Sequence, residues 1–233
     1  MAASAPHPAP GAPGLRVVGV LGGVGSGKST AARALAEAWG PGARVLDADA
    51  AVAELLADPE VLDRLEEAAG RPVRTPAGEV DRPALARVLF ADPEVRRRVE
   101  AVLHPRVRER LRAGLEALEA SDVPSERRLA VLDVPLLLEG GLHRLCDFLV
   151  FVDAPEAQRA ARAGARHGWS EAEWRAREAA QAPLAEKRAA ADAILHNEGA
   201  PEDLRREVED LLPRIRALAP RPLSERRPEP PAP

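Results

Sequence analysis

Residues 21–30, LGGVGSGKST, place four glycines around a lysine and several hydroxyl side chains. The spacing Gly22-x-x-x-x-Gly27-Lys28-Ser29 is typical of a loop whose backbone N–H groups surround a phosphate. Glycine lets those N–H groups turn inward where a Cβ would obstruct them, and the helix expected next points its positive end at the same anion. A Gly-rich turn alone would explain the glycines but not the Lys-Ser pair. The predicted cradle is Gly23, Val24, Gly25, Ser26, Gly27, Lys28, Ser29 and Thr30.

This chemistry indicates a nucleoside triphosphate with Mg²⁺. The ammonium of Lys28 can bridge the β- and γ-phosphates, and the Ser29 hydroxyl can ligate the metal. Lys28 is also one of only two lysines in a chain rich in arginine, which is weak support for a chemical need at that position.

Aspartates follow two short apolar runs that suit strands. Asp47 and Asp49 close the run at 43–47, and Asp133 closes the run at 129–134. Because parallel strands end at the same edge of a sheet, these carboxylates are expected beside the phosphate loop. One can accept the proton of an attacking hydroxyl, and Asp133 can hold Mg²⁺ directly or through water. An aspartate at such a place can also cap a helix, and for either Asp47 or Asp49 this alternative stays open.

The elements that must position these groups alternate along the chain. Continuously apolar runs suit strands that are buried on both faces of a parallel sheet. About eighty residues separate the second strand from the third, more than one crossover helix requires, and apolar residues recur there at helical spacing. A charged helical segment at 155–190 is either a solvated helix pair or a mobile lid. The predicted strands lie at 16–21, 43–47, 129–134, 148–152 and 193–196.

Composition narrows the class of protein. The chain has 233 residues, is 45% apolar and carries a net charge of −4 from well-mixed charges, which argues against a protein that grips nucleic-acid backbone. Its single cysteine, Cys146, excludes an internal disulfide and suits a reducing cytoplasm, where it is expected to be a buried hydrophobe. No apolar run approaches the ~20 residues that span a bilayer. We therefore expect a cytoplasmic protein with no membrane or nucleic-acid partner.

The chain from 16 to 212 resembles the dephospho-coenzyme A kinase family. The resemblance is carried by an ordered series of blocks: GVLGGVGSGKST, VLDADAAVAELL, VLHP, PLLLEGG and QAPLAEKRAAADAILHNEG. It implies an α/β fold, a P-loop kinase core with a five-stranded parallel sheet, a helical substrate-binding insert and a helical lid. It also implies transfer of a phosphoryl group from ATP, with Mg²⁺, to the ribose 3′-hydroxyl of dephospho-CoA. We further expect a monomer or weak homo-oligomer.

The resemblance also implies roles for single residues. Asp49, the second aspartate of DAD, falls on the catalytic base, and Arg159 and Arg177 fall on lid arginines that close over the triphosphate beside Lys28. Two of the substrate residues have simpler alternatives: the His104-Pro105 pair can break a helix, and Glu139 can act only as a cap. Substrate contacts fall on His104, Pro135, Leu136, Leu137 and Glu139.

The Pro/Ala-rich composition of the two ends and the spacing of apolar residues between them divide the chain. Leu21, His167, Trp169 and His196 depart from the usual family residues. The expected division is a disordered tail at 1–14, a nucleotide-binding core at 15–57, 126–154 and 191–219, an insert at 58–125, a lid at 155–190 and a disordered tail at 220–233.

Two other functions are compatible with a phosphate loop. Another small-molecule kinase, acting on a sugar acid or a nucleoside, would keep Lys28 and Asp49 but has no reason to carry VLHP and PLLLEG. A binding module without catalysis would need no base opposite the γ-phosphate, and the DAD block argues against it.

Overall fold

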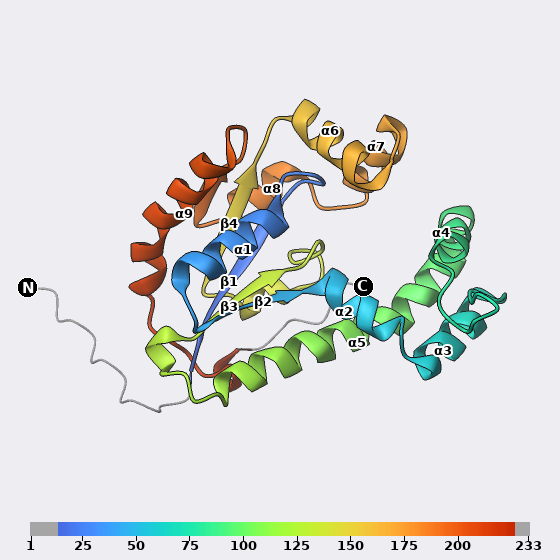
Figure 1. Cartoon of the computed structure of the whole chain (residues 1–233), viewed down its shortest axis with the longest axis horizontal. Coiled ribbons are helices and arrows are strands. Elements are labelled where there is room, and N and C mark those ends of the chain that lie inside the picture. Colours follow the sequence, from blue (N-terminus) through green and yellow to red (C-terminus); the bar gives the residue numbers. More distant parts are fainter. Residues whose placement is uncertain (1–13, 227–233) are drawn as a thin grey trace, which may run out of the picture. The chain divides into compact units, whose positions relative to one another are not determined.

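A computed structural model describes residues 14–226, and Figure 1 shows their arrangement. One sheet has the strand order β2-β3-β1-β4-β5, with β1 parallel to both β3 and β4, and β4 parallel to β5. This confirms the predicted α/β class and its five-stranded parallel sheet. The strands are β1 (Arg16–Gly22), β2 (Ala43–Asp47), β3 (Leu129–Asp133), β4 (Phe148–Asp153) and β5 (Ala193–His196), each within one residue of its predicted bounds.

Helices make up most of the rest of the described chain. They are α1 (Lys28–Trp39), α2 (Ala48–Leu55), α3 (Pro59–Ala69), α4 (Arg82–Ala91), α5 (Pro93–Glu119), α6 (Glu156–His167), α7 (Glu171–Ala179), α8 (Leu184–Ala189) and α9 (Pro201–Arg216). Three short 3₁₀ helices are η1 (Ser125–Arg127), η2 (Leu142–Leu145) and η3 (Leu223–Glu225). Among the residues that the structure describes, no helix is long and apolar enough to cross a membrane.

The sheet is positioned by an apolar core that α1 and α9 share. Val18 and Val20 of β1 pack in one buried cluster with Leu35 of α1 and with Val208 and Ile215 of α9. All seven residues of β1 are buried, as expected for a central strand whose two faces are both covered. The strand that leads into the phosphate loop is therefore buried along its whole length.

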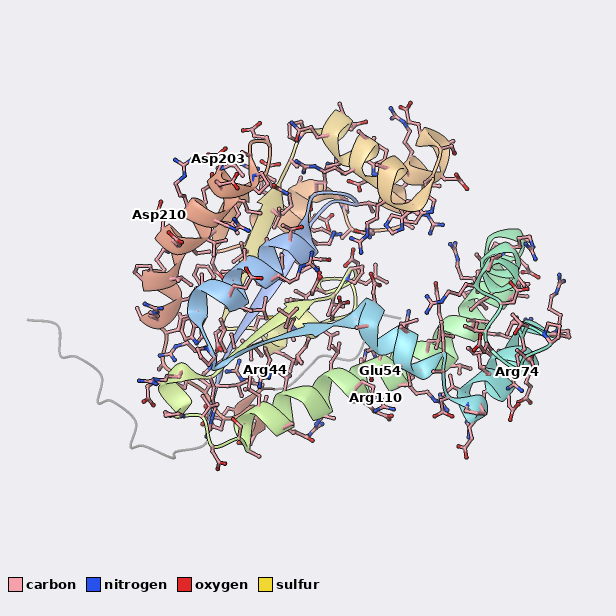
Figure 2. The ribbon with its side chains drawn as sticks, viewed as in Figure 1. Arg44, Glu54, Arg74, Arg110, Asp203 and Asp210 are labelled. Carbon is pink, nitrogen blue, oxygen red and sulfur yellow. The ribbon has the colours of Figure 1, made fainter. Side chains whose placement is uncertain are left out.

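Helix α9 shows how the pattern of the sequence selects the buried face. Leu204, Val208 and Leu211 recur at helical spacing and are buried. Asp203 and Asp210 lie on another side of the helix, as Figure 2 shows. Helix α9 is thus amphipathic, with its apolar stripe turned to the sheet.

The chain divides into two compact units. One contains the described residues up to 46 and those from 115 onward, and the other contains residues 47–114. The second unit has its own apolar core, to which Leu55, Leu62, Leu65, Val88 and Val99 contribute. The predicted insert at 58–125 overlaps this unit and contains α3, α4 and the long helix α5, as the helical spacing of its apolar residues indicates. Its role in substrate binding stays a prediction.

Helix α5 corrects one alternative from the sequence. The His104-Pro105 pair does not end a helix, since α5 continues through both residues and Pro105 lies inside it. The Arg106 guanidinium donates to the Val102 carbonyl oxygen at 2.8 Å, which adds a hydrogen bond next to the position where proline lacks an N–H. His104 is an exposed residue on this helix.

The C-terminal boundary was predicted wrongly. Residues 220–226 are not a free tail, because Leu15 and Arg221 form an antiparallel bridge and η3 follows. The Arg226 guanidinium is completely buried and lies 2.7 Å from the Asp147 carboxylate. The rest of the predicted tails, 1–13 and 227–233, lies outside the described residues.

Asp147 is the residue that anchors this segment. Asp147 Oδ1 lies 2.6 Å from Arg221 Nε. Asp147 Oδ2, which pairs with Arg226, also accepts a hydrogen bond from the Val17 N–H of β1 at 2.8 Å. The sequence could not reveal these contacts, because Asp147 directly precedes β4 and is far along the chain from Arg221 and Arg226.

Candidate active site

The loop between β1 and α1 has the backbone of a phosphate cradle. Gly25 and Gly27 have φ angles of 82° and 93°, in the left-handed region that side chains disfavour. The Gly27 carbonyl oxygen accepts from the N–H groups of Thr30 and Ala31, which starts α1 directly after the loop. The first turn of α1 carries no acidic residue, so its positive end faces the loop uncompensated by its own side chains.

Gly25 is also required by its neighbour in space. A Cβ built on Gly25 would lie 2.2 Å from the backbone oxygen of Arg159. Gly25→Ala is therefore expected to raise the KM for ATP by about tenfold or more, since roughly 1–2 kcal/mol of left-handed backbone strain adds to this clash. Steady-state kinetics with varied ATP measures the change.

Gly70→Ala is the matched control for this prediction. Gly70 has a φ of 66°, yet nothing lies within 4 Å of the position of its Cβ. The substitution introduces the same backbone strain without a clash, outside the loop, and should leave the KM for ATP unchanged. A wild-type KM in Gly25→Ala would show that the loop does not need glycine there.

The loop side chains are arranged for a bound anion. Lys28 Nζ donates to the carbonyl oxygens of Gly23 at 2.8 Å and Gly22 at 3.2 Å, so the ammonium lies over its own loop. The Ser26 hydroxyl is buried and has no hydrogen-bond partner within residues 14–226, which fits a site that is completed by a ligand. Ser29 is half-buried and Thr30 exposed at the start of α1.

The donor set also fits Mg²⁺. Asp133 is buried at the end of β3, the strand beside β1, and Ser29 follows Lys28 in the first turn of α1. The structure shows no group of three His, Cys, Asp or Glu side chains within its described part that could hold a metal. Mg²⁺ at a triphosphate does not need one, because it takes phosphate oxygens and waters with only one or two protein ligands.

Arg159 of α6 lies directly against this loop. Its side chain is 6% exposed, its Nε donates to the Ala154 carbonyl oxygen at 3.2 Å, and its guanidinium lies 5.2 Å from the centre of the Trp174 ring. A Cβ on Gly23 would lie 2.3 Å from Arg159 Nη1. The structure thus brings together the predicted loop and one of the two predicted lid arginines.

Two residues of α7 that the sequence analysis missed complete this contact. The Val24 N–H donates to Glu178 Oε2 at 2.7 Å, and Trp174 Nε1 donates to the Val24 carbonyl oxygen at 3.0 Å. Glu178 is also ion-paired with Arg159. The spacing of Trp174 and Glu178 places both side chains on one face of a helix. It does not indicate that this face contacts the phosphate loop.

Arg177 of α7, the other predicted lid arginine, is held in a stack. Its guanidinium lies 3.9 Å from the centre of the Trp169 ring, which stacks on the His167 ring at 4.2 Å. Partial burial lowers the pKa of Arg177 from its usual value. His167 and Trp169, two departures from the family pattern, thus form an aromatic support for this arginine.

Asn197, which follows β5, also holds the loop. Its Nδ2 donates to the Ser26 carbonyl oxygen at 2.8 Å, and the Asn197 carbonyl oxygen accepts from Arg162 Nη2 at 2.9 Å. A Cβ on Gly27 would lie 2.1 Å from Asn197 Nδ2, so this contact also depends on a loop glycine. Asn197 is a further site residue that the sequence analysis did not select.

Comparisons with known proteins show the family of the chain. The family model described as dephospho-CoA kinase matches residues 16–203. The dephospho-CoA kinase of Deinococcus radiodurans is 42% identical over 206 residues, which cover 88% of this chain and 95% of that protein. The chain belongs to the dephospho-CoA kinase family. The dephospho-CoA kinase of Anaeromyxobacter dehalogenans is also 42% identical, over 87% of this chain and 93% of its own length.

Solved structures support the same fold. The crystal structure of TT1252 from Thermus thermophilus is 38% identical and has a TM-score of 0.68, covering 86% of this chain and 98% of its own. The dephospho-CoA kinase from Campylobacter jejuni, at 21% identity and a TM-score of 0.56, agrees in fold over 86% of this chain and 97% of its own.

The two aspartates of the family's DAD block have different local roles here. Asp47 is the N-cap of α2, because its Oδ1 accepts from the N–H groups of Asp49 at 2.8 Å and Ala50 at 3.2 Å. Asp49 is exposed in the first turn of the same helix. Asp49 and His104 both belong to the unit 47–114.

The turn after β3 contains the other residues that the dephospho-CoA kinase resemblance selects. Leu137 is 1% exposed and its side chain lies against Gly19 of β1, which makes it a core residue, while Pro135 and Leu136 are half-buried. Glu139 Oε1 accepts from the Ala182 N–H at 2.6 Å.

Glu139 is further tied to a buried lysine. Lys187 Nζ lies 3.2 Å from Glu139 Oε1 and donates to Gln181 Oε1 at 2.7 Å, and its side chain is 1% exposed. The Glu139 carboxylate therefore holds the segment that joins α7 to α8. The sequence analysis considered only a cap or a substrate contact for this residue.

Proposed function

We propose that this chain transfers the γ-phosphoryl group of ATP to the ribose 3′-hydroxyl of dephospho-CoA, giving CoA and ADP in the last step of CoA synthesis. The observation that carries the proposal is the match of residues 16–203 to the dephospho-CoA kinase family. The glycine loop between β1 and α1, with Lys28 at the start of the helix, supports it.

In this reaction the protein acts by positioning and by charge. The loop N–H groups and the positive end of α1 bind the β-phosphate, and Lys28 exchanges its loop carbonyl contacts for β- and γ-phosphate oxygens. Mg²⁺, when bound, neutralises charge that develops between the β- and γ-phosphates. Ser29 and Asp133 would hold it, the latter directly or through water.

Asp49 is the proposed general base. Its carboxylate accepts the proton of the 3′-hydroxyl as that oxygen attacks the γ-phosphorus, while the bond to the leaving β-phosphate oxygen breaks. The dephospho-CoA kinase resemblance assigns this role to Asp49, the second aspartate of DAD, while Asp47 is the N-cap of α2. Arg159 and Arg177 donate to the phosphoryl oxygens whose charge shifts during transfer.

The remaining assignments concern the acceptor and the setting. His104, Pro135, Leu136 and Glu139 are the proposed contacts of dephospho-CoA. Leu137, the remaining candidate from the resemblance, is a core residue against Gly19 and shapes the turn after β3 instead of contacting the substrate. The helical insert at 58–125 is the proposed binding region for the acceptor, and the segment at 155–190 is the proposed lid over the triphosphate. We further propose a cytoplasmic enzyme that is a monomer or weak homo-oligomer.

The mass of the product tests the reaction directly. With dephospho-CoA, ATP and Mg²⁺, mass spectrometry should find one added phosphate on the ribose and one ADP per product. A panel of acceptors that includes a sugar acid and a nucleoside separates this activity from that of another small-molecule kinase. ADP release with one of these acceptors and none with dephospho-CoA would overturn the proposal.

A further inference from the structure

The contact between Val24 and Glu178 places an anion on the phosphate loop. Val24 belongs to the predicted cradle, and its N–H donates to Glu178 Oε2 at 2.7 Å. The other oxygen, Oε1, is ion-paired with Arg159. One carboxylate thus accepts from a loop N–H and from a lid guanidinium, the two kinds of donor that phosphate oxygens also prefer.

The surroundings show that this contact lies inside the cradle. A Cβ on Gly23 would lie 2.3 Å from Arg159 Nη1 and 2.8 Å from Glu178 Oε1, so the ion pair lies directly over a loop glycine. Glu178 is 20% exposed and Arg159 6% exposed in their side chains. The pair is therefore shielded from water, and the charge of Arg159 is neutralised by Glu178.

The same helix holds the loop from the other side. Trp174, one turn before Glu178 on α7, is 2% exposed and donates to the Val24 carbonyl oxygen at 3.0 Å. Both backbone groups of Val24 are thus bound by α7. The Trp174 hydrogen bond uses the Val24 carbonyl oxygen, which a phosphate does not need. The Glu178 hydrogen bond uses the Val24 N–H, which is a donor available to a phosphate.

We propose that Glu178 competes with the nucleotide for the phosphate loop and thereby sets its affinity. When a triphosphate binds, the Val24 N–H and the Arg159 guanidinium exchange the Glu178 carboxylate for phosphate oxygens, and Glu178 moves away because two anions repel each other there. Arg159 is thus kept paired until the phosphate arrives. The inference rests on the proposed function only in taking the loop's ligand to be ATP.

Binding of phosphate chains without an acceptor tests the inference. Isothermal titration of the full chain with ATP, and separately with inorganic tripolyphosphate, gives Kd for wild type, Glu178→Gln and Glu178→Ala. We expect Glu178→Ala to lower both Kd values by about tenfold, since a hydrogen bond to a charged group contributes about that much or more. Glu178→Gln, which keeps the shape and loses the charge, should fall between.

A second glutamate of α7 provides the control. Glu171 is exposed and pairs with Arg175 on the outside of the same helix. Glu171→Gln removes the same charge from α7 without touching the loop, and should leave both Kd values within about twofold of wild type. The melting temperature of each variant confirms that the lid helices are folded.

The opposite result identifies a different role for Glu178. If Glu178 only holds α7 on the loop, its loss would raise Kd or leave it unchanged in both variants, and either outcome overturns the inference. The result is independent of the acceptor: a protein that binds tripolyphosphate more tightly without Glu178, yet makes no CoA, would contradict the proposed reaction and not this competition.

Discussion

Asp49→Asn is expected to lower kcat with dephospho-CoA by about 10²–10⁴-fold, the usual contribution of a general base. The amide has the size of the carboxylate but cannot accept the proton of the 3′-hydroxyl. The Kd for ATP should change by less than about twofold, because the triphosphate is held by the glycine loop, Lys28 and the start of α1. Initial rates and equilibrium titration with ATP separate the two quantities.

Asp47→Asn is a closely matched control. It makes the same chemical change two residues away, at the N-cap of α2, where asparagine caps about as well as aspartate. Its kcat should therefore stay near that of wild type. Equal turnover in Asp49→Asn and wild type would remove Asp49 from the mechanism, and a loss confined to Asp47→Asn would reverse the assignment of cap and base.

Asp147→Ala is expected to have the largest effect on stability. Its carboxylate is 6% exposed, pairs with the completely buried Arg226 and accepts from the Val17 N–H. Removing it leaves a buried cation and a strand N–H without their partner, which costs about 3–5 kcal/mol. For a chain of this length that corresponds to a fall in Tm of roughly 10 °C, measured by calorimetry or circular dichroism.

Arg226→Met and the double variant with Asp147→Ala show whether loss of the Asp147–Arg226 ion pair causes the loss of stability. If the uncompensated cation dominates, Asp147→Ala with Arg226→Met should be less destabilised than the sum of the two single variants. Arg205→Gln breaks an exposed pair with Glu202 on α9 and should shift Tm by no more than about 2 °C. A wild-type Tm for Asp147→Ala would show that the C-terminal segment contributes nothing to stability.

The parts of the fold that the sequence predicts are those with local signals. The strands are short apolar runs and the phosphate loop is a fixed spacing of glycines, lysine and serine, so both follow from neighbouring residues. The start of α2 needed the structure, because Asp47 and Asp49 are equally able to cap from sequence alone. Pro105 was open for the same reason, since a proline can end a long helix or lie within it.

The parts that the sequence did not predict depend on pairs that are distant in the chain. Arg226 is ordered by Asp147, and Glu178 meets Val24 on the loop, in both cases across a long interval. Arg226, Asp147 and Glu178 are each ordinary charged residues when taken alone, and Val24 contributes only its backbone N–H to the contact with Glu178. Nothing local distinguishes Glu178 from the exposed glutamates of α7, so its contact with the loop appears only in three dimensions.

The position of β1 in the sheet has a consequence for synthesis on the ribosome. The phosphate-loop strand is made early, but its two neighbours in the sheet are β3, which begins at Leu129, and β4, which begins at Phe148. At about 5–20 residues per second, synthesis of this interval takes on the order of ten seconds, during which the apolar β1 segment has no native partner strand. A nascent chain that stalls before Leu129 therefore exposes an apolar segment that is buried between β3 and β4 in the folded protein.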